Sequence, residues 1–158
     1  MIKAVIFDLD GTLANTIYDL HTAMNSMLKR LGYRSRSIAD LTKFINNGVR
    51  EFVRRSLPRD VQNVDFILES ALQIYKEEYE KCYCEKTVAY QGIEAMLMEL
   101  KGKGYKIAVL SNKQDSFVKE IIYKLFDKKI FTEVWGQLDL PPKPNPSSLL
   151  ALCKVMGV

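Results

Sequence analysis

The hydrophobic and polar positions of the chain follow two patterns, short continuous apolar runs and longer segments with helical periodicity. Ala4–Phe7 and Lys106–Leu110 are runs rich in apolar and β-branched residues, and Phe131–Trp135 is a weaker run of the same kind. Short runs without alternation are typical of strands buried on both faces of a parallel sheet. In the second half of the chain they alternate with helical patterns, which predicts an α/β fold. The helices of this half are expected at about 92–101, 115–126 and 146–156.

The first half interrupts this rhythm, because only helical patterns occur between Asn15 and Lys86. Apolar residues recur at helical spacing from Ile17 to Leu31, and Ser37 is a suitable N-cap for a second helix. A break is expected at Asn46–Gly48. The pattern predicts a helical subdomain, residues 15–86, inserted into an α/β core of residues 1–14 and 87–158. Its helices are expected at 17–31, 37–45, 49–57 and 60–83.

Composition and charge narrow the class of protein. Apolar residues make up 47% of the 158 residues and charged residues 27%, which is typical of a soluble globular protein. The net charge of +4 is spread along the chain without a basic block, so we expect no nucleic-acid partner. We expect no membrane segment, because no apolar run approaches the roughly 20 residues that a membrane span requires. The first residues also lack the pattern of a signal peptide, so a cytoplasmic location is expected.

The cysteines do not predict a disulfide framework or a metal site. Cys82, Cys84 and Cys153 are an odd number, which is not expected of paired cysteines. Cys82 and Cys84 have a spacing that could form half of a metal site, but no second cluster of cysteine or histidine lies near them in the sequence. The single histidine, His21, is assigned no role.

Polar side chains follow the predicted strands directly. Asp8 and Asp10 come after the first strand, Ser111 and Asn112 after the second, and Lys143 lies in a proline-rich stretch before the last helix. The carboxyl ends of parallel strands meet at one edge of a sheet, where α/β proteins bind ligands. Two neighbouring carboxylates are costly there unless a cation or a proton transfer uses them. A turn and a helix cap are the alternative explanation for the two aspartates.

These groups together suit phosphoryl transfer, which requires positioning and charge stabilisation. A carboxylate can act as nucleophile and become an acyl phosphate, while a second carboxylate transfers protons. Mg²⁺ prefers one or two carboxylates together with water and phosphate oxygens. A hydroxyl group and an ammonium group can then hold the phosphate. The sequence therefore predicts a magnesium-dependent site that acts on an anionic small molecule.

The sequence resembles the haloacid dehalogenase superfamily of hydrolases. The resemblance rests on Asp8-x-Asp10-Gly11-Thr12, Ser111-Asn112 and Lys143-Pro144-x-Pro146, and it covers the whole chain. Within the superfamily the chain is similar to phosphoglycolate phosphatase-like members with a C1-type helical cap. The resemblance implies a Rossmann-like parallel sheet with residues 15–86 as the cap. It also implies an Mg²⁺-dependent phosphatase that hydrolyses a small phosphate monoester through an aspartyl-phosphate intermediate.

The resemblance also implies a role for each motif residue. Asp8 would be the nucleophile and a metal ligand, and Asp10 the general acid and base with its carbonyl oxygen on the metal. Ser111 would bind the transferring phosphate, and Asn112 would support it. Lys143 would neutralise phosphate charge and orient Asp8.

Substrate recognition is expected to involve Thr12 of the first motif and a segment of the cap. Asn47, Gly48 and Arg50 are the cap residues expected to contact the substrate, a small phosphorylated metabolite. A solvated basic helix face is the alternative explanation for Arg50.

The chain departs from the resembled group at two places. Asn15-Thr16 stands where an Asp-Ser pair is usual. The acidic fourth motif, expected about ten residues after Gly157, is absent, so we expect a C-terminally truncated core. The first strand would then have an open edge, through which a homodimer could form. A catalytically impaired binding protein and a sugar-phosphate mutase are the alternatives to the phosphatase.

Overall fold

The computed structural model describes residues 2–45 and 47–158 of the chain. They form two compact units. One unit extends to Asn15 and resumes at Val88, and the other consists of Thr16–Thr87. The insert thus begins and ends one residue later than the 15–86 of the prediction. Asn46, which was expected to take part in a helix break, lies outside the described residues.

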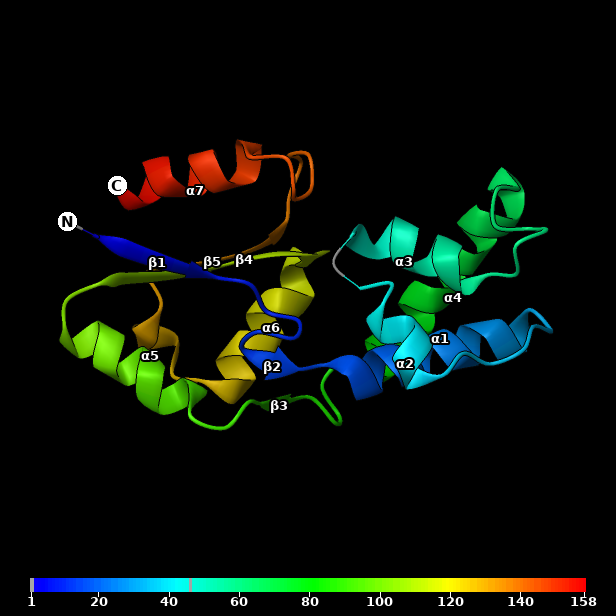
Figure 1. The fold of residues 1–158 in the computed structure, drawn as a ribbon, viewed down its shortest axis with the longest axis horizontal. Helices are drawn as coiled ribbons and strands as arrows, with labels where there is room; N and C mark the ends of the chain where they lie inside the picture. The colour runs from blue at the N-terminus through cyan, green and yellow to red at the C-terminus, as the bar shows by residue number, and fades with distance from the viewer. Residues whose placement is uncertain (1, 46) are drawn as a thin grey trace. The chain divides into compact units, whose positions relative to one another are not determined.

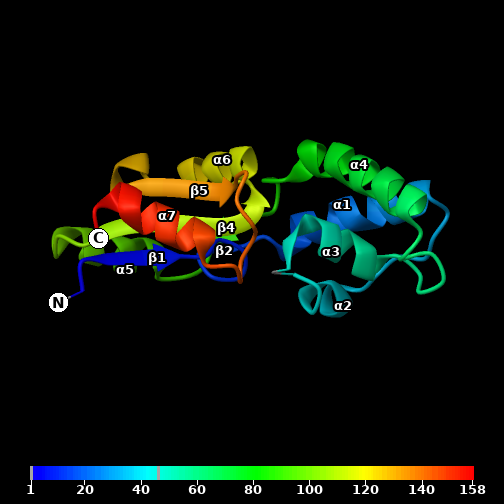
Figure 2. The same cartoon turned by 90° about the horizontal axis from the view of Figure 1, so that it is seen from above.

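A three-stranded parallel sheet forms the centre of the first unit. It consists of β1 (Ala4–Phe7), β4 (Lys106–Gln114) and β5 (Glu133–Gln137) in the order β1-β4-β5 (Figure 2). Phe7 is in register with Val109, and Val109 with Val134. The predicted α/β class with a parallel sheet is confirmed. β1 forms one edge of the described sheet, and the dimer expected through this edge stays a prediction.

Helices cover both faces of this sheet. α5 (Ile93–Gly102) and α6 (Asp115–Leu125) lie on one face, and α7 (Ser147–Met156) lies on the other (Figure 1). Leu152 and Met156 of α7 pack with Ala108 and Leu110 of β4 in a buried cluster, to which partly buried residues of β1 and β5 are added. Burial of these side chains holds α7 on the sheet, since each buried aliphatic side chain contributes roughly 1.5–3 kcal/mol.

Three of the predicted strand boundaries were wrong, one of them the end of β5, which lies at Gln137 and not at Trp135. β4 was expected to end at Leu110, but it continues to Gln114, with a shift of register between Leu110 and Gln114. β5 begins at Glu133, two residues later than predicted, because Lys128–Ile130 forms a 3₁₀ turn first. Asp127 caps that turn by accepting a hydrogen bond from the backbone N–H of Lys129 at 2.9 Å. The polar residues expected just beyond β4 are therefore part of an irregular strand.

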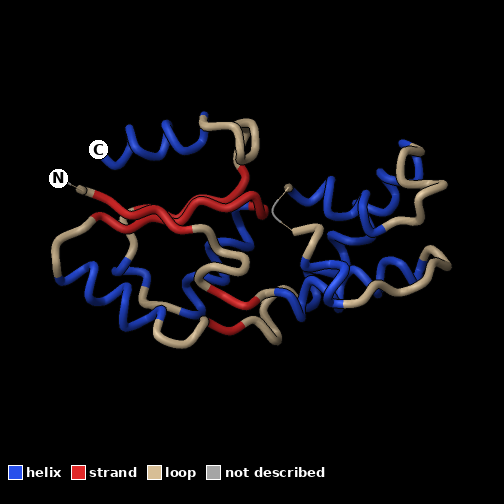
Figure 3. Tube along the Cα trace, in the orientation of Figure 1, coloured by secondary structure: helices blue, strands red, loops and turns tan. Residues whose placement is uncertain are grey.

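The chain leaves and re-enters the α/β unit through two short paired strands. β2 (Ala14–Asn15) and β3 (Val88–Ala89) are antiparallel, with Ala14 opposite Ala89 and Asn15 opposite Val88 (Figure 3). This pair was not predicted, since two residues are too few to show a periodicity. It closes the α/β unit at the points where the insert begins and ends.

The second unit is helical, as predicted. Among its described residues, no helix is long and apolar enough to cross a membrane, and the same holds for the first unit. The buried residues of its core come from every helix, among them Met24, Met27, Leu41, Val53, Leu68 and Tyr75. Its helices are α1 (Ile17–Arg30), α2 (Ile38–Thr42), α3 (Gly48–Ser56) and α4 (Asp65–Cys82).

Local hydrogen bonds explain where these helices begin. Ser37 caps α2, as predicted, because its hydroxyl oxygen accepts a hydrogen bond from the backbone N–H of Asp40 at 3.1 Å. α4 was expected from residue 60 but begins at Asp65. The backbone N–H groups of Val61 and Gln62 bond to the carbonyl oxygen of Pro58 instead, at 3.1 and 3.0 Å. These bonds fold the preceding segment into turns before the helix starts.

The two ends of the helical unit are joined by a buried carboxylate. Asp19, in the first turn of α1, is 1% exposed. Its Oδ1 accepts a hydrogen bond from the backbone N–H of Lys86 at 2.9 Å, and its Oδ2 accepts from the backbone N–H and the hydroxyl group of Thr87 at 2.9 and 2.7 Å. One side chain thus connects the first helical turn with the last residues of the unit.

Candidate active site

Asp8 is the first residue after β1 and lies at the carboxyl end of the sheet. Its Oδ1 is 3.0 Å from the Nζ of Lys143 and also accepts a hydrogen bond from the backbone N–H of Leu9 at 2.8 Å. The side chain is 30% exposed, so solvent and small molecules can reach it. The strand, the backbone donor and the ammonium group together fix the direction of this carboxylate.

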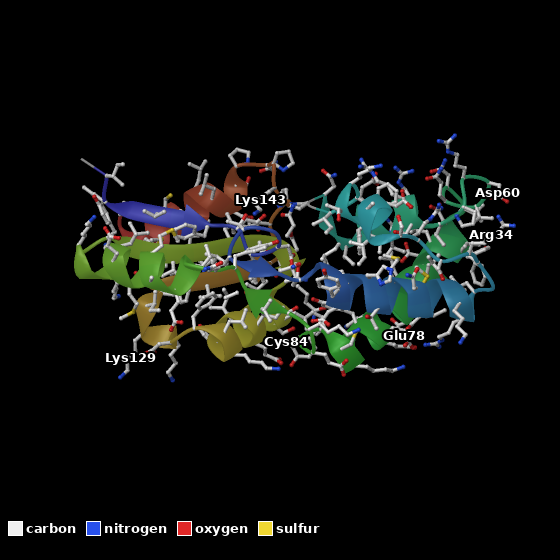
Figure 4. All side chains as sticks on the ribbon, turned by 60° about the horizontal axis from the view of Figure 1, so that its bottom comes forward. Arg34, Asp60, Glu78, Cys84, Lys129 and Lys143 are labelled. Carbon is white, nitrogen blue, oxygen red and sulfur yellow. The ribbon has the colours of Figure 1, made fainter. Side chains whose placement is uncertain are left out.

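Lys143 lies in the loop that leads into α7 (Figure 4). Its Nζ forms the ion pair with Asp8. Its Nζ also donates to the carbonyl oxygen of Leu110, at 2.6 Å, which connects the loop with β4. Asn112 holds the backbone of Lys143 at two points: its Oδ1 accepts from the Lys143 N–H at 2.8 Å, and its Nδ2 donates to the Lys143 carbonyl oxygen at 2.9 Å. The structure therefore gives Asn112 a contact with Lys143, while the support of Ser111 that the sequence suggested stays a prediction.

Asp10 lies two residues after Asp8 and is held in place by a tight turn. The backbone N–H groups of residues 12, 13 and 14 all bond to the carbonyl oxygen of Leu9, and Gly11 has a positive φ of 76°. The Oδ1 of Asp10 is 3.1 Å from the Nζ of Lys113. Lys113 was not among the predicted site residues. Its signal was its position directly after Ser111-Asn112, but burial of a lysine cannot be recognised from the sequence.

The hydroxyl-bearing residues differ in their accessibility. Ser111 is buried within β4, and its Oγ accepts a hydrogen bond from the backbone N–H of Lys113 at 3.2 Å. Thr12 is exposed in the turn after Asp10, and its backbone N–H bonds to the carbonyl oxygen of Leu9 at 3.2 Å. The α/β unit therefore brings Asp8, Lys143 and Asn112 together at one strand end, and Asp10, Lys113 and Ser111 along the adjoining backbone.

The cap residues expected to contact substrate lie at the start of α3 in the helical unit. Asn47 is the N-cap of α3, and Gly48 is its first residue, with a positive φ of 80°. The exposed Arg50 forms an ion pair with Glu69 of α4, with 2.5 Å between Nη1 and Oε1. The role of these three residues in substrate binding stays a prediction.

The donor atoms of the site suit a hard cation. Mg²⁺ binds to a protein through one or two carboxylates or other oxygen ligands, while water and substrate phosphate complete its shell. Among residues 2–45 and 47–158, no group of three or more histidine, cysteine or acidic side chains could hold a metal. A cation here would accordingly depend on Asp8, the Asp10 carbonyl oxygen and the substrate itself.

The cysteines lie apart from this chemistry. Cys82 and Cys84 are buried in the helical unit, and neither takes part in a disulfide bond among the described residues. Burial, together with the nearby Asp19 carboxylate, raises the pKa of the Cys82 thiol to about 11. A thiol in this state is a poor metal ligand at neutral pH, because metals bind the thiolate.

The chain is similar to known proteins in sequence and in structure. The family profile described as haloacid dehalogenase-like hydrolase matches residues 5–158. A phosphoglycolate phosphatase from Psychrobacter arcticus is 36% identical over 162 residues, covering 99% of this chain and 70% of the relative. One from Nitrosospira multiformis is 35% identical, covering 97% of this chain and 69% of the relative.

Structural comparison agrees with the sequence comparison. The crystal structure of a predicted phosphoglycolate phosphatase from Haemophilus somnus superposes with a TM-score of 0.89 and 28% identity, over 99% of this chain and 72% of that one. The family profile, the sequence relatives and the fold support the same assignment. The chain belongs to the haloacid dehalogenase-like hydrolase family.

Proposed function

We propose that this protein is a phosphatase that hydrolyses a small phosphate monoester through a phosphorylated Asp8, with Mg²⁺ as cofactor. The observation that carries the proposal is the arrangement of Asp8: a partly exposed carboxylate at a strand end, 3.0 Å from the Lys143 ammonium, with a second carboxylate two residues away. A nucleophile, a fixed cation and a proton-transferring group are the parts that phosphoryl transfer requires.

The first half of the proposed reaction transfers the phosphoryl group to Asp8. A carboxylate oxygen of Asp8 attacks phosphorus, and the bond between phosphorus and the leaving oxygen breaks. Asp10 donates a proton to that oxygen, so that the product leaves as an alcohol. Lys143, held by Asn112 and by the Leu110 carbonyl oxygen, neutralises charge on the phosphate. When bound, Mg²⁺ would reduce the repulsion between the anionic nucleophile and the anionic substrate.

The second half releases inorganic phosphate. Asp10, now ionised, accepts a proton from a water molecule that attacks phosphorus, and the bond to Asp8 breaks. The Ser111 hydroxyl group would donate to a phosphate oxygen in both halves. Asp8 and Asp10 each end the cycle in the state in which they began.

We infer a small phosphorylated carboxylic acid of the phosphoglycolate type as substrate. The support is the identity of 36% and 35% with two phosphoglycolate phosphatases. Asn47, Gly48 and Arg50 are proposed to select it from the cap.

The test measures inorganic phosphate released from 2-phosphoglycolate by the purified protein with Mg²⁺. Asp8→Asn, which keeps the shape of the side chain, is expected to reduce kcat at least about 10³-fold, and a chelator is expected to abolish turnover until Mg²⁺ is restored. Asp139→Asn, at an exposed aspartate of the same unit, is the matched control and should keep wild-type activity.

Mass spectrometry of acid-quenched enzyme should identify phosphate on the peptide that contains Asp8. If Asp8→Asn turned over substrate at the wild-type rate, Asp8 would not be the nucleophile. Transfer of the phosphoryl group within a sugar phosphate, without release of inorganic phosphate, would favour a mutase instead.

A further inference from the structure

We propose that Lys113 is a positioning residue for the reaction, because its ammonium group fixes the orientation of the Asp10 carboxylate that transfers protons. This inference rests on the proposed function and concerns a residue outside the motif residues considered so far. It is carried by the burial of the Lys113–Asp10 ion pair and by the way β5 holds the backbone of Lys113.

The pair is unusually well shielded for a lysine and an aspartate. The side chain of Lys113 is 7% exposed and that of Asp10 is 12% exposed, with 3.1 Å between Nζ and Oδ1. Lysine is rarely buried to this extent unless it is paired, because its ammonium group is strongly hydrated in water. The other ion pair of the site, Asp8 with Lys143, is much more open, at 30% and 31% exposure. The Lys113 pair is therefore suited to hold a fixed geometry.

The backbone from which Lys113 extends is held by a close approach of β5. A Cβ atom added to Gly136 would lie 2.5 Å from the carbonyl oxygen of Lys113 and 2.4 Å from the Cα of Asp115. Only glycine fits at this distance. The N–H of Gly136 also donates to Oδ1 of Asp115 at 2.9 Å. The strand thus fixes the backbone of residues 113–115, and with it the position from which the Lys113 side chain extends.

These contacts form a continuous connection from β5 to the carboxylate of Asp10. Gly136 lets β5 approach the backbone, the backbone sets the direction of Lys113, and Lys113 binds Oδ1 of Asp10. Misplacement of a catalytic group by about 1 Å can reduce a rate 10²-fold. We therefore expect the loss of Lys113 to act on the proton transfer that Asp10 performs.

The test compares two substrates that need this proton transfer to different extents. 2-Phosphoglycolate has an alkyl leaving group that must be protonated, whereas p-nitrophenyl phosphate has a leaving group that needs little protonation. Lys113→Met keeps the length of the side chain without its charge. It is expected to lower kcat/KM about 10²-fold for 2-phosphoglycolate and less than tenfold for p-nitrophenyl phosphate. Lys113→Arg, which keeps the charge, should show a smaller loss in the same direction.

The matched controls are substitutions at sites without these contacts. Lys103→Met removes a lysine that is 61% exposed and paired across the surface with Glu99, so turnover of both substrates should be unaffected. Gly136→Ala should reproduce the substrate-dependent loss, whereas Gly102→Ala, with no atom within 4 Å of the added methyl group, should not. Circular dichroism and thermal unfolding establish whether each variant is folded. If Lys113→Met does not fold, the comparison of the two substrates is made with Lys113→Arg.

The outcomes separate the inference from the proposed function. An equal loss for both substrates, or no loss for either, in an enzyme whose wild type is active would overturn the positioning role alone. A wild-type protein that releases phosphate from neither ester would overturn the proposed function and the inference with it.

Discussion

Removal of the Asp19 carboxylate should destabilise the helical unit more than any single surface change. The side chain is buried and accepts hydrogen bonds from two backbone N–H groups and one hydroxyl group, all contributed by Lys86 and Thr87. Three substitutions remove increasing parts of this arrangement: Thr87→Val removes the hydroxyl donor, Asp19→Asn replaces one acceptor by a donor, and Asp19→Ala removes both acceptors.

The expected sizes follow from the number of bonds lost and from what can replace them. A hydrogen bond to a charged group contributes about 1.5–3 kcal/mol, and a buried donor without an acceptor is unfavourable by about 1–3 kcal/mol. Water can replace the acceptor of Lys86, which is exposed, but not readily that of the buried Thr87. We therefore expect losses in the free energy of unfolding of roughly 1 kcal/mol for Thr87→Val, 2 kcal/mol for Asp19→Asn and 3 kcal/mol for Asp19→Ala.

Two measurements follow this loss in the unit concerned. Urea unfolding monitored by circular dichroism reports on the helices, while the fluorescence of Trp135, the single tryptophan of the sequence, follows the α/β unit. Hydrogen exchange of the Thr87 amide should accelerate about 100-fold in Asp19→Ala, since 1.4 kcal/mol corresponds to a factor of ten. Asp60→Ala, at an exposed aspartate of the same unit (Figure 4), is the control and should change neither quantity.

A specific result would refute this reasoning. If Asp19→Ala destabilised the protein no more than Thr87→Val, or left exchange at Thr87 unchanged, the carboxylate would not be what joins the two ends of the helical unit.

Two further predictions concern ionisation. Arg54, and to a smaller extent Arg55, hold the pKa of Glu51 at about 2, so this carboxylate stabilises the folded state above its ordinary pKa of 4.5 and loses that effect as the pH falls toward 2. Because the groups are partly exposed, Glu51→Gln should lower the free energy of unfolding by only about 1 kcal/mol at pH 7, and the difference from wild type should shrink below pH 4.5; a constant difference across this range in urea unfolding would contradict the assignment. Iodoacetamide at pH 8 should modify the partly exposed Cys153 before Cys82, whose pKa is about 11, and peptide mass spectrometry showing the reverse order in folded protein would contradict the burial argument.

The sequence was sufficient for features that depend on local pattern. Ala4–Phe7 and Lys106–Leu110 are apolar over their whole length or nearly so, and such short runs are typical of buried strands. The parallel sheet, with Asp8 at the carboxyl end of its first strand, could therefore be predicted. Ser37 was recognisable as an N-cap because its partner Asp40 lies three residues away. In each case the residues that determine the structure are neighbours in the chain.

Features that depend on a distant neighbour could not be predicted. β4 continues beyond Leu110 because β5 pairs with Gln114, and the close approach at Gly136 is a property of two strands that are separate in the sequence. The burial of Lys113 follows from that pairing, and a lysine in a polar stretch gives no sign of it. The segment before Asp65 contains residues that suit both a turn and a helix, and the carbonyl oxygen of Pro58 decides between them.

The paired strands β2 and β3 make the helical unit a replaceable part of the chain. Ala14 lies opposite Ala89 and Asn15 opposite Val88, so the two cut points of the insert are adjacent, within the roughly 5 Å that separates paired residues of antiparallel strands. A tight hairpin turn of two residues can bridge this distance, so the α/β unit can close on itself whatever lies between its cut points. Inserts of very different length or helix content could be exchanged at this position without altering the register of the sheet, so the insert can diverge in sequence while Asp8 and Asp10 keep their positions.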